Sequence, residues 1–210
     1  GRVLEIGCAT GEFLSQVRSA GRAVLGVEYN PDVATIARSR YGLDVLTGDL
    51  LENEAKVAAC GPFAAVVMRF VLEHVPRPAL VVRAVARLLA PRGRFIFSIP
   101  NPESADAAVF GRWWIGHDVP RHFNNFPARA LRHCLTSAGL RTEKVVYSPV
   151  PNDWIGSVNY WLTDHGAPPA LRRFFRYENV VATALFLPLG VVSRLFRASG
   201  RFRIIARQVD

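Results

Sequence analysis

The sequence predicts an α/β fold: a doubly wound, mostly parallel sheet whose last strand runs antiparallel. Short apolar runs that end at Gly or acidic residues alternate with segments of helical period, as in repeated β-α units. The chain has 210 residues, enough for one core of this kind. Half of the residues are apolar and 20% are charged, a composition that excludes intrinsic disorder and small disulfide scaffolds.

In the first half of the chain, strands are predicted where apolar runs end at a turn residue, and helices where apolar residues recur at helical spacing. The stretch APRGR, residues 90–94, is expected to stop a helix and form a tight turn, because Pro and Gly do not continue a helix. These criteria place strands at residues 3–6, 23–27, 44–47, 63–68 and 94–99, helices at 11–20, 31–41 and 77–89, and a weak helical turn at 52–59.

In the second half, Gly139 is the predicted cap of a helix. The elements expected there are an aromatic-rich loop at 101–126, a helix at 127–138, a strand at 142–147, an apolar stretch at 149–200 and a last strand at 202–209.

This order predicts a domain organisation with one interruption. Residues 1–148 form the core, and residues 201–210 supply its last strand. Residues 149–200 form an apolar helical insertion that caps the substrate or docks on a membrane.

The spacing of the cysteines and the start of the sequence indicate the cellular compartment in which the protein is expected. The three cysteines have no metal or disulfide spacing, which favours a reducing cytoplasm. No apolar run approaches the roughly 18 residues of a spanning helix, and the chain opens on a strand-like run, not a signal peptide. It also opens without Met, so we expect a segment to precede Gly1 in the full-length protein.

The formal net charge of +9 is concentrated at one end, because residues 170–210 carry six of these nine charges. This distribution predicts that the C-terminal segment meets an anionic surface, and no nucleic-acid partner is expected. The oligomeric state stays open.

Residues 180–192 form an apolar run of 13 residues, too short to cross a bilayer and interrupted by Pro188. We expect it to lie on the inner face of the cell membrane as a peripheral element, with arginines meeting anionic lipid. A buried core helix or a dimer interface is the alternative. The bracketing basic residues are Arg172, Arg173, Arg176, Arg194, Arg197, Arg201 and Arg203.

The strongest motif is VLEIGCATGEF, a strand that runs into a Gly-punctuated turn and a helix. Gly7 and Gly11 let the backbone turn sharply and approach a ligand, and the helix N-terminus offers N–H groups to it. A dinucleotide fingerprint would need Gly where Ala9 and Glu12 stand, which disfavours a nicotinamide oxidoreductase. A purely structural turn is the other alternative.

Two acidic residues follow the next two strands, Glu28 in GVEYNP and Asp49 in GDL. The carboxyl ends of parallel strands share one edge, so both carboxylates should border one crevice. One carboxylate can accept both hydroxyls of a ribose, and another can accept an adenine amine.

Together, the motifs EIGCATG, GVEYNP, GDL and VLEHVPRP resemble the class I S-adenosylmethionine-dependent methyltransferases over about residues 1–146. The resemblance implies a Rossmann-like, seven-stranded sheet, with S-adenosyl-L-methionine as the cofactor. It also implies methyl transfer to a small or lipid-linked acceptor, with oxygen as the expected methylated atom. A catalytically inactive cofactor-binding or membrane-adaptor module is a further alternative.

The same resemblance assigns cofactor roles along the chain. Glu5, Gly7 and Gly11 would shape the methionine end of the site. Glu28 would hold the ribose, and Asp49 with Leu50 would frame the adenine. The remaining predicted cofactor-binding positions are Cys8, Ala9, Tyr29, Met68 and Arg69.

The segment after the fourth strand is similar to that of ubiquinone-biosynthesis-type methyltransferases, some of which carry a metal-binding E-x-x-E-H motif. This chain has Glu73 and His74, but Phe70 stands at the first Glu position. One carboxylate and one imidazole are too few ligands for a hard divalent cation, so no metal is expected.

The second chemical cluster is WWIGHDVPRHFNNF, whose D-x-P-R-H element resembles one found after the fifth strand in a subgroup of these enzymes. We expect this loop to open onto the cofactor crevice, with His122 as the general base and Asp118 and Arg121 as its partners. The structural alternative is a loop pinned by an Asp118–Arg121 pair, with His122 bonded to a backbone carbonyl.

Overall fold

The computed structural model describes residues 1–209, so residue 210 of the predicted segment 201–210 lies outside the described residues. Its strands are β1 (Arg2–Ile6), β2 (Val24–Glu28), β3 (Val45–Thr47), β4 (Phe63–Arg69), β5 (Leu89–Pro100), β6 (Leu140–Tyr147) and β7 (Arg201–Gln208). They form one seven-stranded sheet in the order β3-β2-β1-β4-β5-β7-β6.

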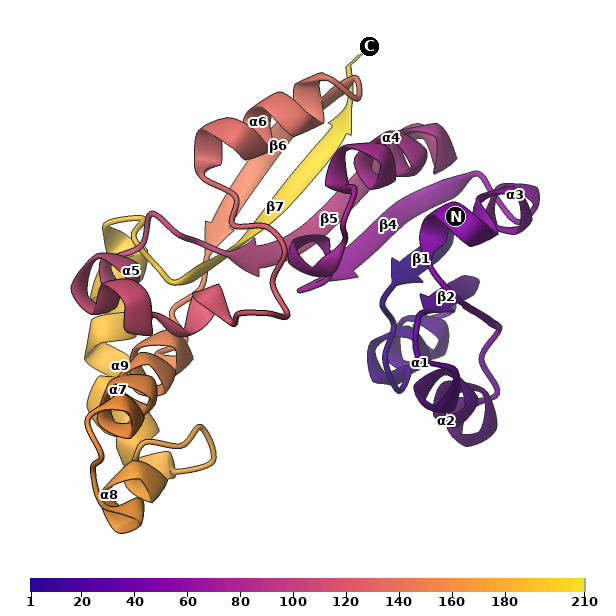
Figure 1. Ribbon diagram of the computed structural model, residues 1–210. Coiled ribbons are helices and arrows are strands. Elements are labelled where there is room, and N and C mark those ends of the chain that lie inside the picture. The colour runs from indigo at the N-terminus through magenta and orange to yellow at the C-terminus, as the bar shows by residue number, and fades with distance from the viewer. Residues whose placement is uncertain (210) are drawn as a thin grey trace. The chain divides into compact units, whose positions relative to one another are not determined.

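Strand direction confirms the predicted fold class. The pairs β1–β2, β1–β4, β2–β3 and β4–β5 are parallel. Figure 1 shows β7 running opposite to its neighbours β5 and β6. The order reverses between β1 and β4, and in open α/β sheets ligands bind beyond the strand ends at such a switch point.

Helices connect the strands and fill the second half of the chain. The α-helices are α1 (Glu12–Ser19), α2 (Pro31–Tyr41), α3 (Leu50–Ala59), α4 (Pro78–Leu88), α5 (Ala105–Phe110), α6 (Ala128–Thr136), α7 (Asn152–Asp164), α8 (Pro169–Phe174) and α9 (Val180–Leu195). The 3-10 turns are η1 (Leu72–His74), η2 (Gly111–Trp113) and η3 (Ile115–His117). Three helices therefore occupy the predicted apolar helical insertion.

The structure corrects two local expectations. The predicted weak turn at 52–59 belongs to a ten-residue helix, α3, because Asp49 and Glu52 form a reciprocal capping box at its start. The predicted tight turn at residues 90–94 is present, since a Cβ on Gly93 would lie 2.8 Å from the carbonyl oxygen of Ala90, but strand β5 begins before it, at Leu89, and not at residue 94. The β4–β5 register shifts there, so the Pro and Gly residues form an irregularity within the strand.

The chain forms two compact units. The sheet unit contains Gly1–Ser98, Leu131–Val145 and the residues from Ile204 onward, and the helical unit contains Ile99–Ala130 and Val146–Arg203. The sequence-based boundaries at 148 and 200 stay a prediction.

In the sheet unit, small residues bring the first two helices close to β1. A Cβ on Gly11 would lie 3.0 Å from the Cβ of Ala37 on α2, so this approach requires Gly. One buried cluster joins the β1 tip to these helices, formed by Cys8, Leu14, Ala34, Ala37, Leu43 and Val45.

In the helical unit, α9 reverses the usual burial pattern. Its buried residues are the small side chains Ala182, Gly190 and Ser193. A Cβ on Gly190 would lie 2.1 Å from the carbonyl oxygen of Pro149, so the backbone approach there requires Gly. Phe186 of α9 is half-buried against Phe175, whereas its other large apolar side chains are exposed, namely Val180, Val181, Leu185, Leu187, Leu189, Val191, Val192 and Leu195.

The helical unit also buries a group of polar side chains. Asp106 is fully buried, and its Oδ2 accepts the indole N–H of Trp114 at 2.7 Å. Asp153 is paired with Arg201, whose Nε donates to Oδ2 at 2.8 Å. A Cβ on Gly200 would lie 2.5 Å from Asp106 Oδ2 and 2.6 Å from Asp153 Cβ. The backbone therefore passes between these two side chains at a position where only Gly fits.

Burial, together with the nearby Asp153 charge, raises the pKa of Asp106 from 3.8 to about 6. Between these two pH values the folded state binds more protons than the unfolded state, so the free energy of unfolding falls as pH rises through this window. Above about pH 6 the ionised, buried carboxylate costs on the order of 3 kcal/mol.

Asp106→Asn keeps an oxygen acceptor for Trp114 and removes this charge. We expect the variant to melt at a higher temperature than wild type at pH 7.5, with the difference shrinking toward pH 4.5, in thermal unfolding followed by circular dichroism. Asp164→Asn, at an exposed carboxylate of the same unit, is the control. A difference in melting temperature that does not change with pH would contradict the assignment.

Candidate functional site

The turn between β1 and α1 depends on positions where a side chain does not fit. Gly7 and Gly11 have φ of +69° and +83°, and a Cβ on Gly7 would lie 2.4 Å from Val71 Cγ2. Ala9, which stands at the middle Gly of the family motif, adopts φ of 48°. The chain therefore keeps the left-handed turn despite the substitution, and α1 begins without a side-chain cap on its first N–H groups.

Glu28 ties two strand tips together. Its Oε2 accepts the backbone N–H of Ala9 at 2.9 Å, and its Oε1 accepts that of Asn30 at 3.0 Å. A carboxylate oxygen has a second lone-pair direction, so both oxygens can still accept a hydroxyl. The predicted acidic residue at the end of β2 is thus held in a fixed position.

Asp49 lies at the same edge, as predicted. The preceding residue, Gly48, donates its N–H to the carbonyl oxygen of Glu28 at 3.0 Å. Asp49 Oδ1 accepts the N–H of Glu52 at 2.8 Å as the cap of α3. One oxygen of this carboxylate therefore has a structural role that sequence reasoning missed, although the spacing of Asp49 and Glu52 is that of a capping box.

Glu5 and Arg69 form an ion pair at the ends of β1 and β4. Arg69 donates to Glu5 Oε1 through Nε at 2.9 Å and Nη2 at 2.8 Å, and its guanidinium lies 4.6 Å from the ring centre of Phe13. Burial raises the pKa of Glu5 to about 7, an effect that Arg69 partly offsets. Glu5 Oε2 is buried and has no hydrogen-bond partner among the described residues.

The other predicted cofactor positions differ in exposure. Tyr29 is 76% exposed, whereas Cys8, Leu50 and Met68 are buried. Buried side chains cannot touch a ligand directly, so these three positions can contribute through backbone atoms or by shaping their neighbours. The sequence pattern places them at the strand ends but does not reveal which way their side chains point.

The D-x-P-R-H element lies in the helical unit. Arg121 Nη2 donates to Asp118 Oδ1 at 2.8 Å, and Asp118 adopts the left-handed φ of 34°. His122 Nδ1 lies 2.8 Å from the carbonyl oxygen of Gly116, and His122 Nε2 lies 3.7 Å from Asp118 Oδ2. Both contacts of the structural alternative are therefore present.

The contact with Gly116 favours one tautomer of His122. A carbonyl oxygen only accepts hydrogen bonds, so Nδ1 carries the proton and Nε2 carries the lone pair of the neutral ring. That lone pair is what a general base requires. The expected meeting of this loop with the cofactor crevice stays a prediction.

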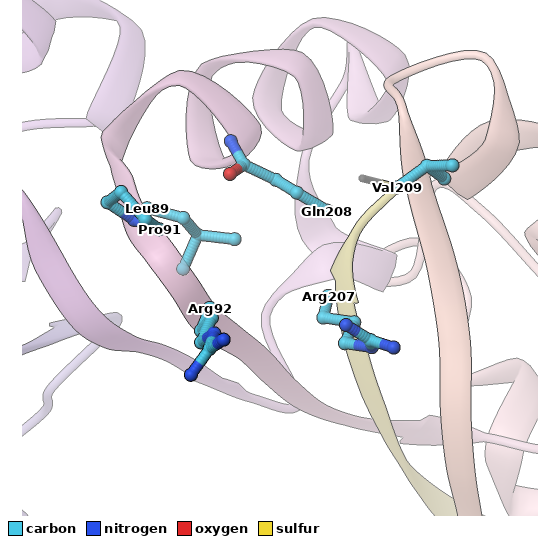
Figure 2. A pocket seen from close by; sticks show the side chains of 6 residues that line it. All are labelled: Leu89, Pro91, Arg92, Arg207, Gln208 and Val209. Carbon is cyan, nitrogen blue, oxygen red and sulfur yellow. The ribbon is translucent and has the colours of Figure 1, made fainter.

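A hollow of about 380 Å³ lies elsewhere in the sheet unit (Figure 2). Arg92 and Arg207 reach it from neighbouring strands, β5 and β7 (Figure 2). It lies where β5 begins and β7 ends, which is the edge of the sheet opposite the tips of β1, β2 and β3. This hollow is separate from the candidate site and is lined by Leu89, Pro91, Arg92, Arg207, Gln208 and Val209.

Comparisons with known proteins agree with this geometry. The family model described as "Methyltransferase domain" matches residues 1–145. A ubiquinone biosynthesis O-methyltransferase of Xanthomonas oryzae pv. oryzae is 34% identical over 165 residues, which cover 72% of this chain and 68% of the relative. One from Thiobacillus denitrificans is 33% identical over 165 residues, covering 71% and 69%.

A solved methyltransferase structure has a similar fold. The crystal structure of a SAM-dependent methyltransferase from Archaeoglobus fulgidus superposes with a TM-score of 0.63 at 20% identity, covering 99% of this chain and 86% of that one. The chain belongs to the methyltransferase domain family, and its fold is that of an S-adenosylmethionine-dependent methyltransferase. The resemblance seen in the sequence is thereby confirmed, and the alternatives of a nicotinamide oxidoreductase and an inactive module are set aside.

Glu28→Ala removes the carboxylate at the β2 tip. We expect the affinity for S-adenosylhomocysteine to fall by roughly 1.5–3 kcal/mol, the scale of hydrogen bonds to a charged group, in isothermal titration calorimetry. Glu54→Ala, which breaks an ion pair with Arg87 between α3 and α4, is the matched control and should leave affinity unchanged. Wild-type affinity in a folded Glu28→Ala protein would rule out the ribose role.

Proposed function

We propose that this enzyme methylates an oxygen atom of a small, lipid-linked acceptor, with S-adenosylmethionine held at the tips of β1, β2 and β3. The observation that carries the cofactor site is the Glu28 carboxylate, fixed by two backbone N–H groups next to the left-handed turn. Relatives at 33–34% identity are named ubiquinone biosynthesis O-methyltransferases, which supports an oxygen acceptor on a lipid-linked molecule.

The residues at these tips fit the cofactor. Gly7 and Gly11 leave space that a Cβ would fill, and Glu28 offers acceptors for two ribose hydroxyls. Asp49 keeps its Oδ2 for the adenine amine while Oδ1 caps α3. The pair of Glu5 and Arg69 places opposite charges at the methionine end.

When bound, the cofactor supplies a methyl group on a positively charged sulfur. Holding the acceptor oxygen in line with that methyl group is expected to give most of the acceleration. Within the chain, His122 takes the hydroxyl proton on Nε2, because Nδ1 already donates to Gly116. Asp118, 3.7 Å from Nε2, favours the imidazolium that forms, and Arg121 holds Asp118 in place.

The exposed apolar surface of α9 supports docking on an anionic membrane. No helix within residues 1–209 combines the length and hydrophobicity that crossing a bilayer requires. The outward side chains of α9 can enter the headgroup boundary, while the exposed Arg173, Arg176, Arg194 and Arg197 meet anionic lipid. A lipid-linked acceptor would then reach the enzyme from the bilayer.

Incubation with methyl-labelled S-adenosylmethionine and separated lipid and aqueous cell extracts tests the function. We expect label in an alkali-resistant, ether-linked product in the lipid extract. His122→Ala should lower this turnover by about 100-fold or more while calorimetry shows unchanged cofactor affinity, within the range of acid–base groups.

The control for this variant is His133→Ala, at a histidine on α6. If His122→Ala lowers melting temperature and cofactor affinity together with turnover, the loop has a structural role instead. Label confined to the aqueous extract would contradict a lipid-linked acceptor.

Membrane docking has a test of its own. In flotation with vesicles containing anionic phosphatidylglycerol, we expect the protein to float at low salt and to be released as salt rises, because screening weakens the arginine contacts. Leu185→Asp with Leu189→Asp should abolish flotation, and Leu4→Val, in the buried sheet, should not. A wild-type protein that stays in solution at low salt would overturn the docking proposal.

A further inference from the structure

A buried carboxylate in the helical unit has no part in the methyl transfer derived above. Asp106 lies in the first turn of α5, fully buried, and accepts the indole N–H of Trp114 at 2.7 Å. Its Oδ1 is buried without a hydrogen-bond partner among the described residues. Taking such a group out of water is costly, so the hydrogen bond from Trp114, together with contacts from Ser104 and the local backbone, holds the carboxylate in place.

The indole of Trp114 in turn determines where the backbone of Gly116 runs. Trp114 is buried, and a Cβ on Gly116 would lie 2.2 Å from its Cζ2 and 2.3 Å from its Cη2. The backbone of Gly116 therefore lies directly against the ring. The intervening Ile115 is also fixed, because its N–H donates to Ser157 Oγ at 3.1 Å.

Gly116 then fixes the imidazole. Its carbonyl oxygen, 2.8 Å from His122 Nδ1, sets both the ring orientation and the tautomer. The contacts form a continuous series from a carboxylate through an aromatic ring and a peptide carbonyl to the histidine. Every residue of this series lies within the helical unit.

We propose that Asp106 is a positioning residue for His122: it orients Trp114, whose ring sets the Gly116 carbonyl that keeps His122 in the Nδ1-protonated tautomer. This inference rests on the proposed function, because the tautomer of His122 affects catalysis only if His122 is the general base. The structural claim itself concerns only the helical unit.

The tautomer can be measured directly. In protein with ¹⁵N-labelled histidine, the His122 signals, assigned by their loss in His122→Ala, report which ring nitrogen carries the proton. We expect Nδ1–H in the wild type at a pH where the ring is neutral. In Asp106→Leu and in Trp114→Phe, which remove the acceptor and the donor of the first link, we expect Nε2–H to appear, with kcat at least 10-fold lower and cofactor affinity unchanged.

Two further variants separate positioning from general damage. Asp106→Asn restores an oxygen acceptor and should return the His122 signals to the wild-type tautomer. Trp154→Phe removes another indole hydrogen bond of the same unit, the one to Ser193 Oγ at 3.3 Å, and should leave the His122 signals unchanged.

The outcomes distinguish this inference from the proposed function. If Asp106→Leu does not fold, Trp114→Phe, which keeps an aromatic ring, carries the test. A folded Trp114→Phe protein with the wild-type His122 tautomer overturns the positioning role. Full turnover in His122→Ala overturns the base role of His122. The tautomer measurement then still tests whether Asp106 positions the His122 ring.

Discussion

The fixed Glu28 carboxylate is the interaction on which the candidate cofactor site depends. The loops after β1 and β2 each present a backbone N–H that would otherwise need solvent, and one side chain accepts both. Because both hydrogen bonds are made within the protein, they hold the acceptor oxygens in a defined orientation. The left-handed turn from Gly7 to Gly11 brings the Ala9 N–H to this carboxylate.

A second constraint is the balance of charge at the β1 end. Burial alone would keep Glu5 neutral at physiological pH, whereas the Arg69 guanidinium favours its ionised form. The two effects bring the pKa of Glu5 to about 7. A group poised in this way responds to small changes in its surroundings, and an added positive charge nearby would favour the carboxylate. At the proposed methionine end, the ionisation of Glu5 thus depends on Arg69, while Glu28 is held by two backbone hydrogen bonds.

Close backbone approaches at glycines accompany the buried apolar side chains of the helical unit, such as Ile155 and Leu162. Gly190 packs on the carbonyl of Pro149, Gly200 passes between Asp106 and Asp153, and Gly116 lies on Trp114. These glycines let polar and aromatic groups fill the interior of the unit, so most of the large apolar side chains of α9 are left outside. A surface of this kind is typical of an interaction site.

The sequence by itself determined the β-α alternation, the glycine turn and the acidic residues at the strand ends, because hydrophobic periodicity and turn chemistry are local properties. Only the tertiary structure decided that β5 continues through Pro91 and how the interior of the 101–126 loop packs. It also decided the direction in which the side chains of Leu50 and Met68 point. The sequence could not single out Asp106, because its role depends on burial against Trp114. The cost of an unsatisfied polar group depends on which distant segments exclude water from it.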